Sequence, residues 1–170
     1  MATVKQQIQQ GIREMLLHFT DCKAKNVVCG FNNRVAQPAD NQFIIFTVLN
    51  PFRYGTPVVR VEKDKNDKAK NISTQTYRCE VQIDFYGDLA FDWACDIVNI
   101  SRTEFLCQFL KRYGIQPIAC ENAQNLTGTL GEMEYVERWM VRFEIDYQKT
   151  VADNQDYFTT VDMEIFETEL

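Results

Sequence analysis

The sequence has little of what most enzyme active sites require. It contains a single histidine, His18, so a Ser-His-Asp or Cys-His site would depend on that residue alone. His18 falls in the last turn of a predicted helix, where an imidazolium ion interacts favourably with the helix dipole. The phosphate-binding patterns GxxxxGK(S/T) and GxGxxG are absent, and Gly128 and Gly131 are interpreted as turn glycines. We therefore expect no catalytic residue and no bound cofactor.

Positive charge and long apolar runs are also scarce. The chain has 18 basic and 24 acidic residues, a net charge of −6, whereas a protein that grips DNA through its phosphates needs concentrated Lys and Arg. This balance does not exclude a protein that surrounds DNA without binding it. The most apolar run, FIIFTVL at 43–49, is much shorter than the roughly 20 residues of a membrane helix. Since MATVKQQIQQ lacks the apolar core of a secretory signal, we expect a soluble protein that is made and kept in a cytoplasm.

Cysteines in a metal-binding spacing are missing. No two of the six cysteines lie two or three residues apart, so a zinc site is not indicated. Without a secretory signal the six side chains are expected to be free thiols, several of them buried. The cysteines are Cys22, Cys29, Cys79, Cys95, Cys107 and Cys120.

The apolar spacing predicts an α+β fold. Steps of three and four predict an amphipathic helix over 3–19. Residues 42–50 are nearly all apolar and predict a strand buried on both faces, ended by Asn50-Pro51. Alternation predicts further strands over 77–86, 139–147 and 161–166, with 148–156 as a turn or loop and a short, broken segment after Gly114. We expect one domain over 1–170, with a mainly antiparallel or mixed sheet packed against an N-terminal helix and a central pair of helices.

The segment VQIDFYGDLAFDWA (81–94) changes from strand to helix periodicity at Gly87-Asp88. Gly87 permits a tight turn, and Asp88 is a preferred N-cap for a helix that runs to about Asn99. Residues 101–104 match a capping box for a second helix, which Tyr113-Gly114 ends. Its inward-facing residues are expected to be Phe105, Leu106, Phe109 and Leu110.

Apart from Ala69, every residue of the segment EKDKNDKAKN (62–71) is charged or polar. It predicts either a solvated hairpin tip or loop, or an arm, over about 60–73, that contacts a partner. In the second case the interacting residues would be Lys63, Asp64, Lys65, Asp67 and Lys68. Since its lysines alternate with aspartates, the segment is not a simple phosphate-binding patch.

Acidic side chains recur at alternate positions of two predicted strands. These residues are Glu80, Asp84, Glu144 and Asp146. Neighbouring strands could bring such carboxylates together around Mg²⁺, as in a metal-dependent nuclease. Neither strand supplies the lysine that often accompanies such a site, and the polar face of a half-buried sheet is usually solvated, so we predict no metal ligand.

Two segments carry a family resemblance. QIDFYGDLAFDWACDIV (82–98) and NLTGTLGEMEYVERWMVRFEIDY (125–147) resemble the neck or tail terminator proteins of contractile-tailed bacteriophages. The matching features are Asp84-Phe85-Tyr86-Gly87, Thr127-Gly128 and Tyr135-Val136-Glu137-Arg138-Trp139, and the resemblance covers roughly 40–166. It implies a structural motif that includes Gly87, Asp88, Gly128, Arg138 and Trp139.

The resemblance implies a structural virion protein that acts by binding. Such terminators form a hexameric ring that caps the tail tube, stops its growth and joins the tail to the head connector. Expected partners are further copies of the chain, the tail-tube protein, the sheath and the connector or neck proteins, with DNA passing through the channel and no membrane contact. Acids proposed to line that channel and repel phosphate are Glu132, Glu134, Glu144 and Asp146, with further candidates in the C-terminal DMEIFETEL. The alternatives are a small metal-dependent phage nuclease and a dimeric cytoplasmic adaptor.

Overall fold

The computed structural model describes residues 3–31, 38, 40–53, 55–63, 69–130 and 134–155. Its helices are α1 (Val4–Phe19), α2 (Ala90–Ile100) and α3 (Glu104–Lys111), with a short 3₁₀ helix at Ala24–Asn26. The strands are β1 (Val27–Cys29), β2 (Phe43–Arg53), β3 (Val58–Lys63), β4 (Ala69–Tyr86), β5 (Ile115–Cys120), β6 (Gln124–Asn125), β7 (Gly128–Leu130), β8 (Glu134–Val136) and β9 (Arg138–Gln155). The predicted α+β class is confirmed.

Two compact units make up the chain. The first contains residues 1–55 and 76–149, and the second contains 56–75 and 150–170. The long strands β4 and β9 each contribute residues to both.

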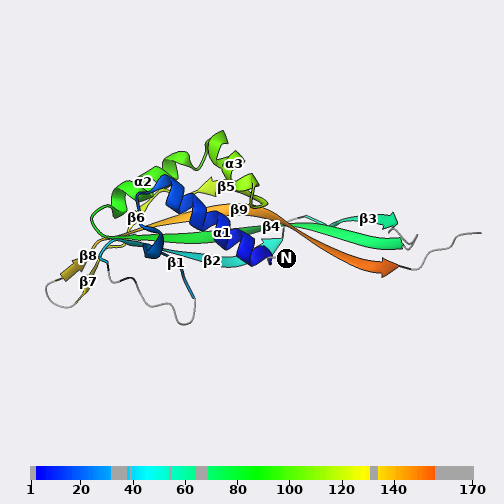
Figure 1. Cartoon of the computed structure of the whole chain (residues 1–170), viewed down its shortest axis with the longest axis horizontal. Helices are drawn as coiled ribbons and strands as arrows, with labels where there is room; N and C mark the ends of the chain where they lie inside the picture. Colours follow the sequence, from blue (N-terminus) through cyan, green and yellow to red (C-terminus); the bar gives the residue numbers. More distant parts are fainter. Residues whose placement is uncertain are drawn as a thin grey trace, which may run out of the picture. The chain divides into compact units, whose positions relative to one another are not determined.

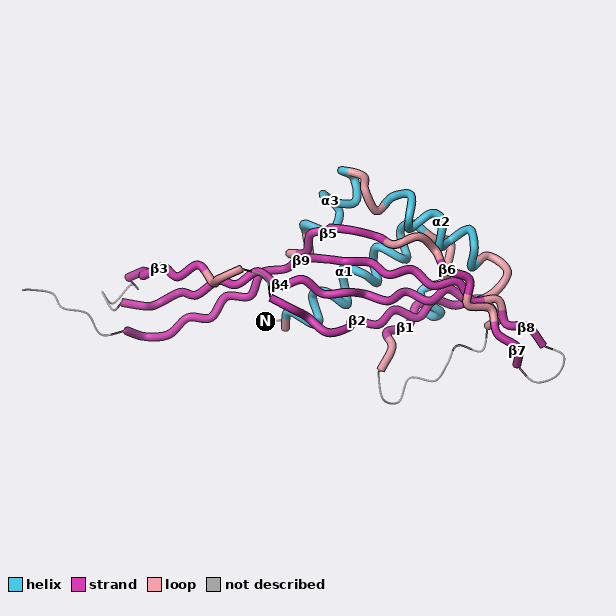
Figure 2. The backbone as a smooth tube through the Cα atoms, turned by 180° about the vertical axis from the view of Figure 1, so that it is seen from behind, coloured by secondary structure: helices cyan, strands magenta, loops and turns pink. Residues whose placement is uncertain are grey.

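A mixed sheet is built in the order β1-β2-β4-β9-β5. β1 and β2 are parallel, whereas β4 is antiparallel to β2 and β5 is antiparallel to β9. β3 pairs with β4, β6 pairs with β9, and β7 with β8 forms a separate two-stranded sheet. Within the first unit the helices cover one face of this sheet (Figure 1), and Figure 2 looks onto the opposite face.

Helix α1 confirms the predicted 3–19 helix. Thr3 and Gln6 cap its start reciprocally, since each side chain accepts a hydrogen bond from the other residue's backbone N–H. Its buried face packs against the sheet through Ile8, Ile12, Met15 and Leu16.

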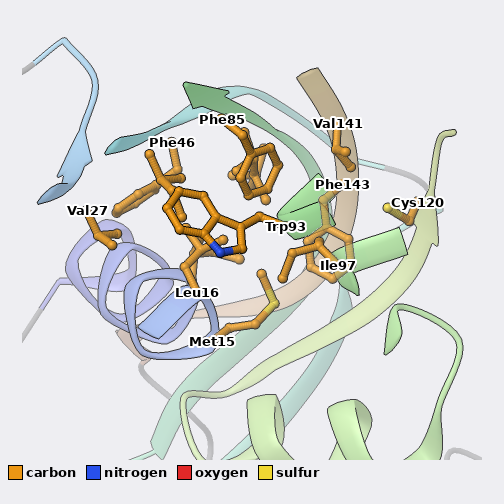
Figure 3. Packing of buried hydrophobic residues seen from close by; sticks show 14 of the residues in the cluster. Met15, Leu16, Val27, Phe46, Phe85, Trp93, Ile97, Cys120, Val141 and Phe143 are labelled. Atoms are coloured by element: carbon orange, nitrogen blue, oxygen red, sulfur yellow. The ribbon is translucent and has the colours of Figure 1, made fainter. Parts of the chain in front are cut away.

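The core lies between the sheet and the three helices. Figure 3 shows Met15, Leu16, Phe46 and Trp93 pointing toward one another. The predicted alternation is confirmed on β4, where Val81, Ile83 and Phe85 are fully buried, and on β9, where Val141, Phe143 and Ile145 are fully buried. Burying each such side chain contributes about 1.5–3 kcal/mol, so this face fixes the register of both strands.

Strand β2 differs from its prediction at its end. It continues through Pro51 to Arg53 instead of stopping at Asn50. The pairing with β4 shifts register between Val48 and Pro51, and such a bulge accommodates a residue that has no N–H to donate. Its burial on both faces is confined to the first half, because residues 50–53 are exposed.

The starts of α2 and α3 also differ from prediction. Leu89, not Asp88, precedes α2, and no side chain caps it. For α3 the cap is Thr103, whose hydroxyl accepts from the Leu106 N–H, so the predicted capping box over 101–104 is wrong. Leu106 and Leu110 are buried as expected, whereas Phe105 is exposed.

Several segments assigned to turns belong to strands. β5 replaces the predicted broken segment after Gly114. Gly128 is the first residue of β7, not a turn glycine, and β9 continues to Gln155 through the predicted 148–156 loop. The predicted strand over 161–166 and the turn glycine Gly131 lie outside the described residues.

Candidate interaction surfaces

Residues of three separate segments meet at one junction in the first unit through side-chain and backbone hydrogen bonds. Arg138, the first residue of β9, has Nη2 at 2.8 Å and Nε at 3.1 Å from Asp84 Oδ1. The backbone N–H of Arg138 donates to Thr127 Oγ1 at 3.3 Å, and the N–H of Gly87 donates to the Glu137 carbonyl at 3.1 Å. We call these five residues, Asp84, Gly87, Thr127, Glu137 and Arg138, the motif junction.

Aromatic and amide groups surround the buried carboxylate of the junction. Gln82 Nε2 donates to Asp84 Oδ2 at 2.8 Å, so both oxygens of this carboxylate are engaged. Arg138 lies over the ring of Tyr86, which stacks on Phe43 with 4.4 Å between ring centroids. Burial raises the pKa of Tyr86, and Asp84 adds to this rise against the opposing effect of Arg138. For Arg138, burial would lower the pKa, but the hydrogen bond and charge of Asp84 outweigh it and leave the pKa raised.

Gly87 holds the strand-to-helix turn in a conformation that suits glycine. Its φ is +99°, and an added Cβ would lie 2.6 Å from the Asn41 carbonyl oxygen. The Ala90 N–H donates back to the Gly87 carbonyl at 2.9 Å. The turn therefore extends to Leu89 before α2 begins, which explains why Asp88 does not cap the helix.

Trp139 and Gly128 lie next to this junction. The Trp139 Nε1–H donates to Glu137 Oε1 at 3.0 Å. The Trp139 ring packs edge-on against the Phe91 ring, with 4.8 Å between the ring centroids. Gly128 pairs with Val136 in the β7–β8 hairpin. The segments that carry the resemblance are therefore joined by packing and hydrogen bonds.

The face of the sheet away from the helices carries a row of ion pairs. Arg78 Nε lies 2.8 Å from Asp146 Oδ1, and Arg78 Nη2 lies 3.2 Å from Asp146 Oδ2. Arg78 also lies 3.7 Å from Glu144, and Arg142 lies 3.3 Å from Glu80. Together with Arg138–Asp84 these contacts join β4 to β9 across the sheet.

This pairing overturns the expectation that the acids on these strands are simply solvated. Asp84 and Asp146 are buried, and each forms an ion pair with an arginine. A metal ion would have to displace guanidinium groups to reach these carboxylates. Among the described residues there is no group of three or more His, Cys, Asp or Glu side chains placed to hold a metal ion.

The sequence analysis named Arg138 as a motif residue but did not predict its partner Asp84, and it missed Arg78 and Arg142. Arg78 and Asp146 are 68 residues apart in the chain, and Arg138 and Asp84 are 54 apart. The sequence does contain a pattern that could have indicated these pairs. Arginines and acids occupy the polar positions of two strands whose alternating apolar residues predict that both lie in the same sheet.

A polar pocket of about 460 Å³ lies elsewhere in the first unit. It is lined by Asp21, Cys22, Lys23, Asn26, Asp40, Asn41, Gln42, Leu89 and Trp93. Asn26 and Lys25 hold the pKa of the Asp40 carboxyl below its usual range through hydrogen bonding and charge. Burial raises the pKa of the Cys22 thiol to about 11. The Asp40 carboxyl therefore favours its ionised form, and the Cys22 thiol favours its protonated, unreactive form.

Cys79 and Cys120 are buried, and His18 packs against an aromatic ring. All six cysteines are free, as predicted, and burial raises the pKa of Cys79 and Cys120 to about 11. His18 lies in the last turn of α1, as predicted, and stacks on Phe109 at 5.2 Å between centroids.

Of the five proposed interaction residues, the structure describes Lys63. Lys63 is the last residue of β3 and is exposed, whereas Asp64, Lys65, Asp67 and Lys68 lie outside the described residues. The hairpin itself is present, since β3 pairs with the first part of β4. Of the proposed channel acids, Glu144 and Asp146 lie on the ion-paired face. Glu132, the side chain of Glu134 and the C-terminal DMEIFETEL lie outside the described residues.

The described residues form an α+β fold in which the ion pairs Arg78–Asp146 and Arg138–Asp84 join strands β4 and β9. The family model for phage neck terminator proteins matches residues 6–169, and the chain belongs to that family. No curated protein matches the sequence.

Family membership gives the protein its general role. It is a structural protein of the bacteriophage neck and tail, and it interacts with other proteins of the tail or head. No helix among the described residues is both long and apolar enough to span a membrane.

Proposed function

We propose that the protein is a ring-forming terminator that caps the tail tube, stops its growth and joins the tail to the head connector. The family match over residues 6–169 is the observation that carries this proposal. The ring is a hexamer in which one surface of each subunit meets a different surface of the next. It is present in the host cytoplasm during assembly and afterwards in the virion neck.

The polar side chains support a binding role rather than catalysis. Asp84 and Asp146 are engaged by Arg138 and Arg78, and the thiols of Cys22, Cys79 and Cys120 have raised pKa values. The nuclease alternative used those same carboxylates as metal ligands. We therefore infer that the protein is not an enzyme.

The channel is proposed to let DNA pass without binding it. The ion-paired face carries the carboxylates Glu80, Asp84, Glu144 and Asp146 and the guanidinium groups of Arg78, Arg138 and Arg142. Their pairing leaves little positive charge to attract phosphate. Glu132, Glu134, Glu144 and Asp146 stay as the proposed channel acids, with the charge of Asp146 offset by Arg78.

Tube growth provides the direct test. Purified tail-tube protein is allowed to polymerise with and without the terminator, and tube length and tube ends are measured in negative-stain images. We expect shorter tubes with a ring at one end. Unchanged tubes without rings would contradict the proposal. Cleavage of DNA with Mg²⁺ or Mn²⁺, lost in Glu80→Ala or Asp146→Ala, would favour the nuclease instead.

A further inference from the structure

The second unit contains a three-stranded ribbon. Its described parts are β3, the start of β4 and the end of β9, and β4 lies between the other two (Figure 1). The hydroxyl groups of Thr74 on β4 and Thr150 on β9 are 3.1 Å apart. No described helix belongs to this unit.

One edge of the ribbon is formed by β3. All of its residues are exposed, and Val58, Val59 and Val61 are 69%, 60% and 61% exposed. Within the described chain β3 pairs with β4 alone. An exposed, valine-rich edge strand presents backbone N–H and C=O groups on which another strand can pair.

The other edge is formed by residues 150–154 of β9. Strand β5 pairs with β9 only as far as Tyr147, and β6 pairs with it at residues 139 and 140. Beyond Tyr147, β4 is therefore the one described neighbour of β9. This edge is also apolar at Val151, which is 58% exposed.

The two edges point to a second copy of this chain as the occupant. They lie on opposite sides of the same ribbon, and each offers about five residues, 58–62 and 150–154. A cyclic ring requires two different complementary surfaces on each subunit. A two-fold contact between two β3 edges would leave both β9 edges uncovered.

Strand direction defines how the edges would pair. β3 is antiparallel to β4. β4 is antiparallel to β9, because Asp84 contacts Arg138 while Arg78 contacts Asp146. β3 and β9 therefore run in the same direction. If neighbouring copies are placed side by side in the same orientation, β3 of one copy and β9 of the next pair in parallel.

We propose that the β3 edge of one subunit pairs in parallel with residues 150–154 of the next, so that the ribbons form a continuous sheet around the ring. This inference rests on the proposed ring-forming function and assigns its subunit contact. The exposed valines of β3 and Val151 of β9 would then have side-chain neighbours on the adjacent strand. Such cross-strand contacts stabilise strand pairing.

Cysteine cross-linking tests the contact. Val59 and Val151 lie on the same face of the ribbon, because Val59 pairs with Ser73 and Thr74 contacts Thr150. The double variant Val59→Cys/Val151→Cys is made in a Cys95→Ser background, which removes the exposed native thiol. Within one subunit β4 separates the two positions by about 10 Å, beyond the reach of a disulfide. Combinations using Val61 or Asp153 sample other registers.

The double variants are assembled with tail-tube protein and treated with a mild oxidant. We expect a ladder of cross-linked species up to the ring, and no ladder from either single variant or from the control pair Val59→Cys/Gln108→Cys. Rings without the ladder would overturn this contact while leaving the proposed function intact. Dimers from Val59→Cys or Val61→Cys alone would reveal a two-fold contact and would also overturn it. No ring in any variant or in the native chain would overturn both proposals.

Discussion

Arg138 and Asp84, which are 54 residues apart in the sequence, are joined by two hydrogen bonds: Nη2 and Nε of Arg138 donate to the same carboxylate oxygen, Asp84 Oδ1, at 2.8 and 3.1 Å. The contact joins the start of β9 to the end of β4. It therefore connects the two segments that carry the family resemblance.

Replacing Asp84 with alanine should destabilise the protein by about 2 kcal/mol, because it leaves the guanidinium of Arg138 without its buried partner. We expect less than the loss for a fully buried pair, since the Arg138 side chain is 35% exposed. Urea unfolding measures the free energy. Glu80→Ala is the matched control, because its partner Arg142 is 46% exposed, and it should cost below about 1 kcal/mol. Equal losses for the two variants would contradict the assigned role.

Gly87→Ala should also destabilise the fold, by about 2 kcal/mol or more, because the new Cβ would meet the Asn41 carbonyl in a left-handed backbone conformation. Gly55→Ala is the control, since Gly55 also has a positive φ but an added Cβ there would meet no described atom within 4 Å. It should lose only about 1 kcal/mol from backbone strain. Thermal and urea unfolding of both variants compare the two sites. If Gly55→Ala proved the more damaging, the turn would not depend on the close approach at Gly87.

Stability should fall as pH rises from about 9 to 11. Burial raises the pKa of Cys22, Cys79 and Cys120 to about 11, whereas an unfolded thiol titrates near 8.5. Across this window the unfolded chain loses protons that the folded chain retains, so the contribution is complete below the unfolded pKa and disappears as pH passes the folded one. Urea unfolding at several pH values measures the slope, and Cys79→Ala should reduce it. A slope unchanged by that substitution would argue against the thiol contribution.

Charging the β3 edge should prevent ring closure. In the variant Val59→Lys/Val61→Lys both replaced side chains are exposed, so the subunit should fold normally while strand pairing is opposed. We expect loss of the ring-sized species by light scattering with an unchanged circular dichroism spectrum. Phe105→Lys on α3, also at an exposed apolar position, should leave the ring intact. Rings of normal mass in the double variant would count against the β3 contact.

The sequence predicted the elements whose apolar spacing is regular. Val81, Ile83 and Phe85 alternate and are buried together, because a period of two places them on one side of a strand. Local stop signals were less reliable. Pro51 did not end β2, because a bulge absorbs it, and Asp88 did not cap α2, because the turn at Gly87 continues to Leu89.

The interaction surfaces were harder to predict from the sequence. Asp84 and Asp146 are paired with arginines that are 54 and 68 residues away in the chain, and these partners come together only when β4 and β9 pair. The charged segment 62–71 predicted a hairpin tip or loop, or an arm that contacts a partner, but it did not indicate that the adjoining strand β3 exposes valines on an edge. Such properties arise from strand neighbours rather than from local composition.

Solution mass tests the central claim most directly. Size exclusion with light scattering is applied to the native chain, of subunit mass 19.9 kDa, with and without purified tail-tube protein. A hexameric ring that forms or is strengthened when tubes are present is the predicted result. A discrete dimer that is indifferent to tubes would contradict the terminator function and favour the adaptor alternative.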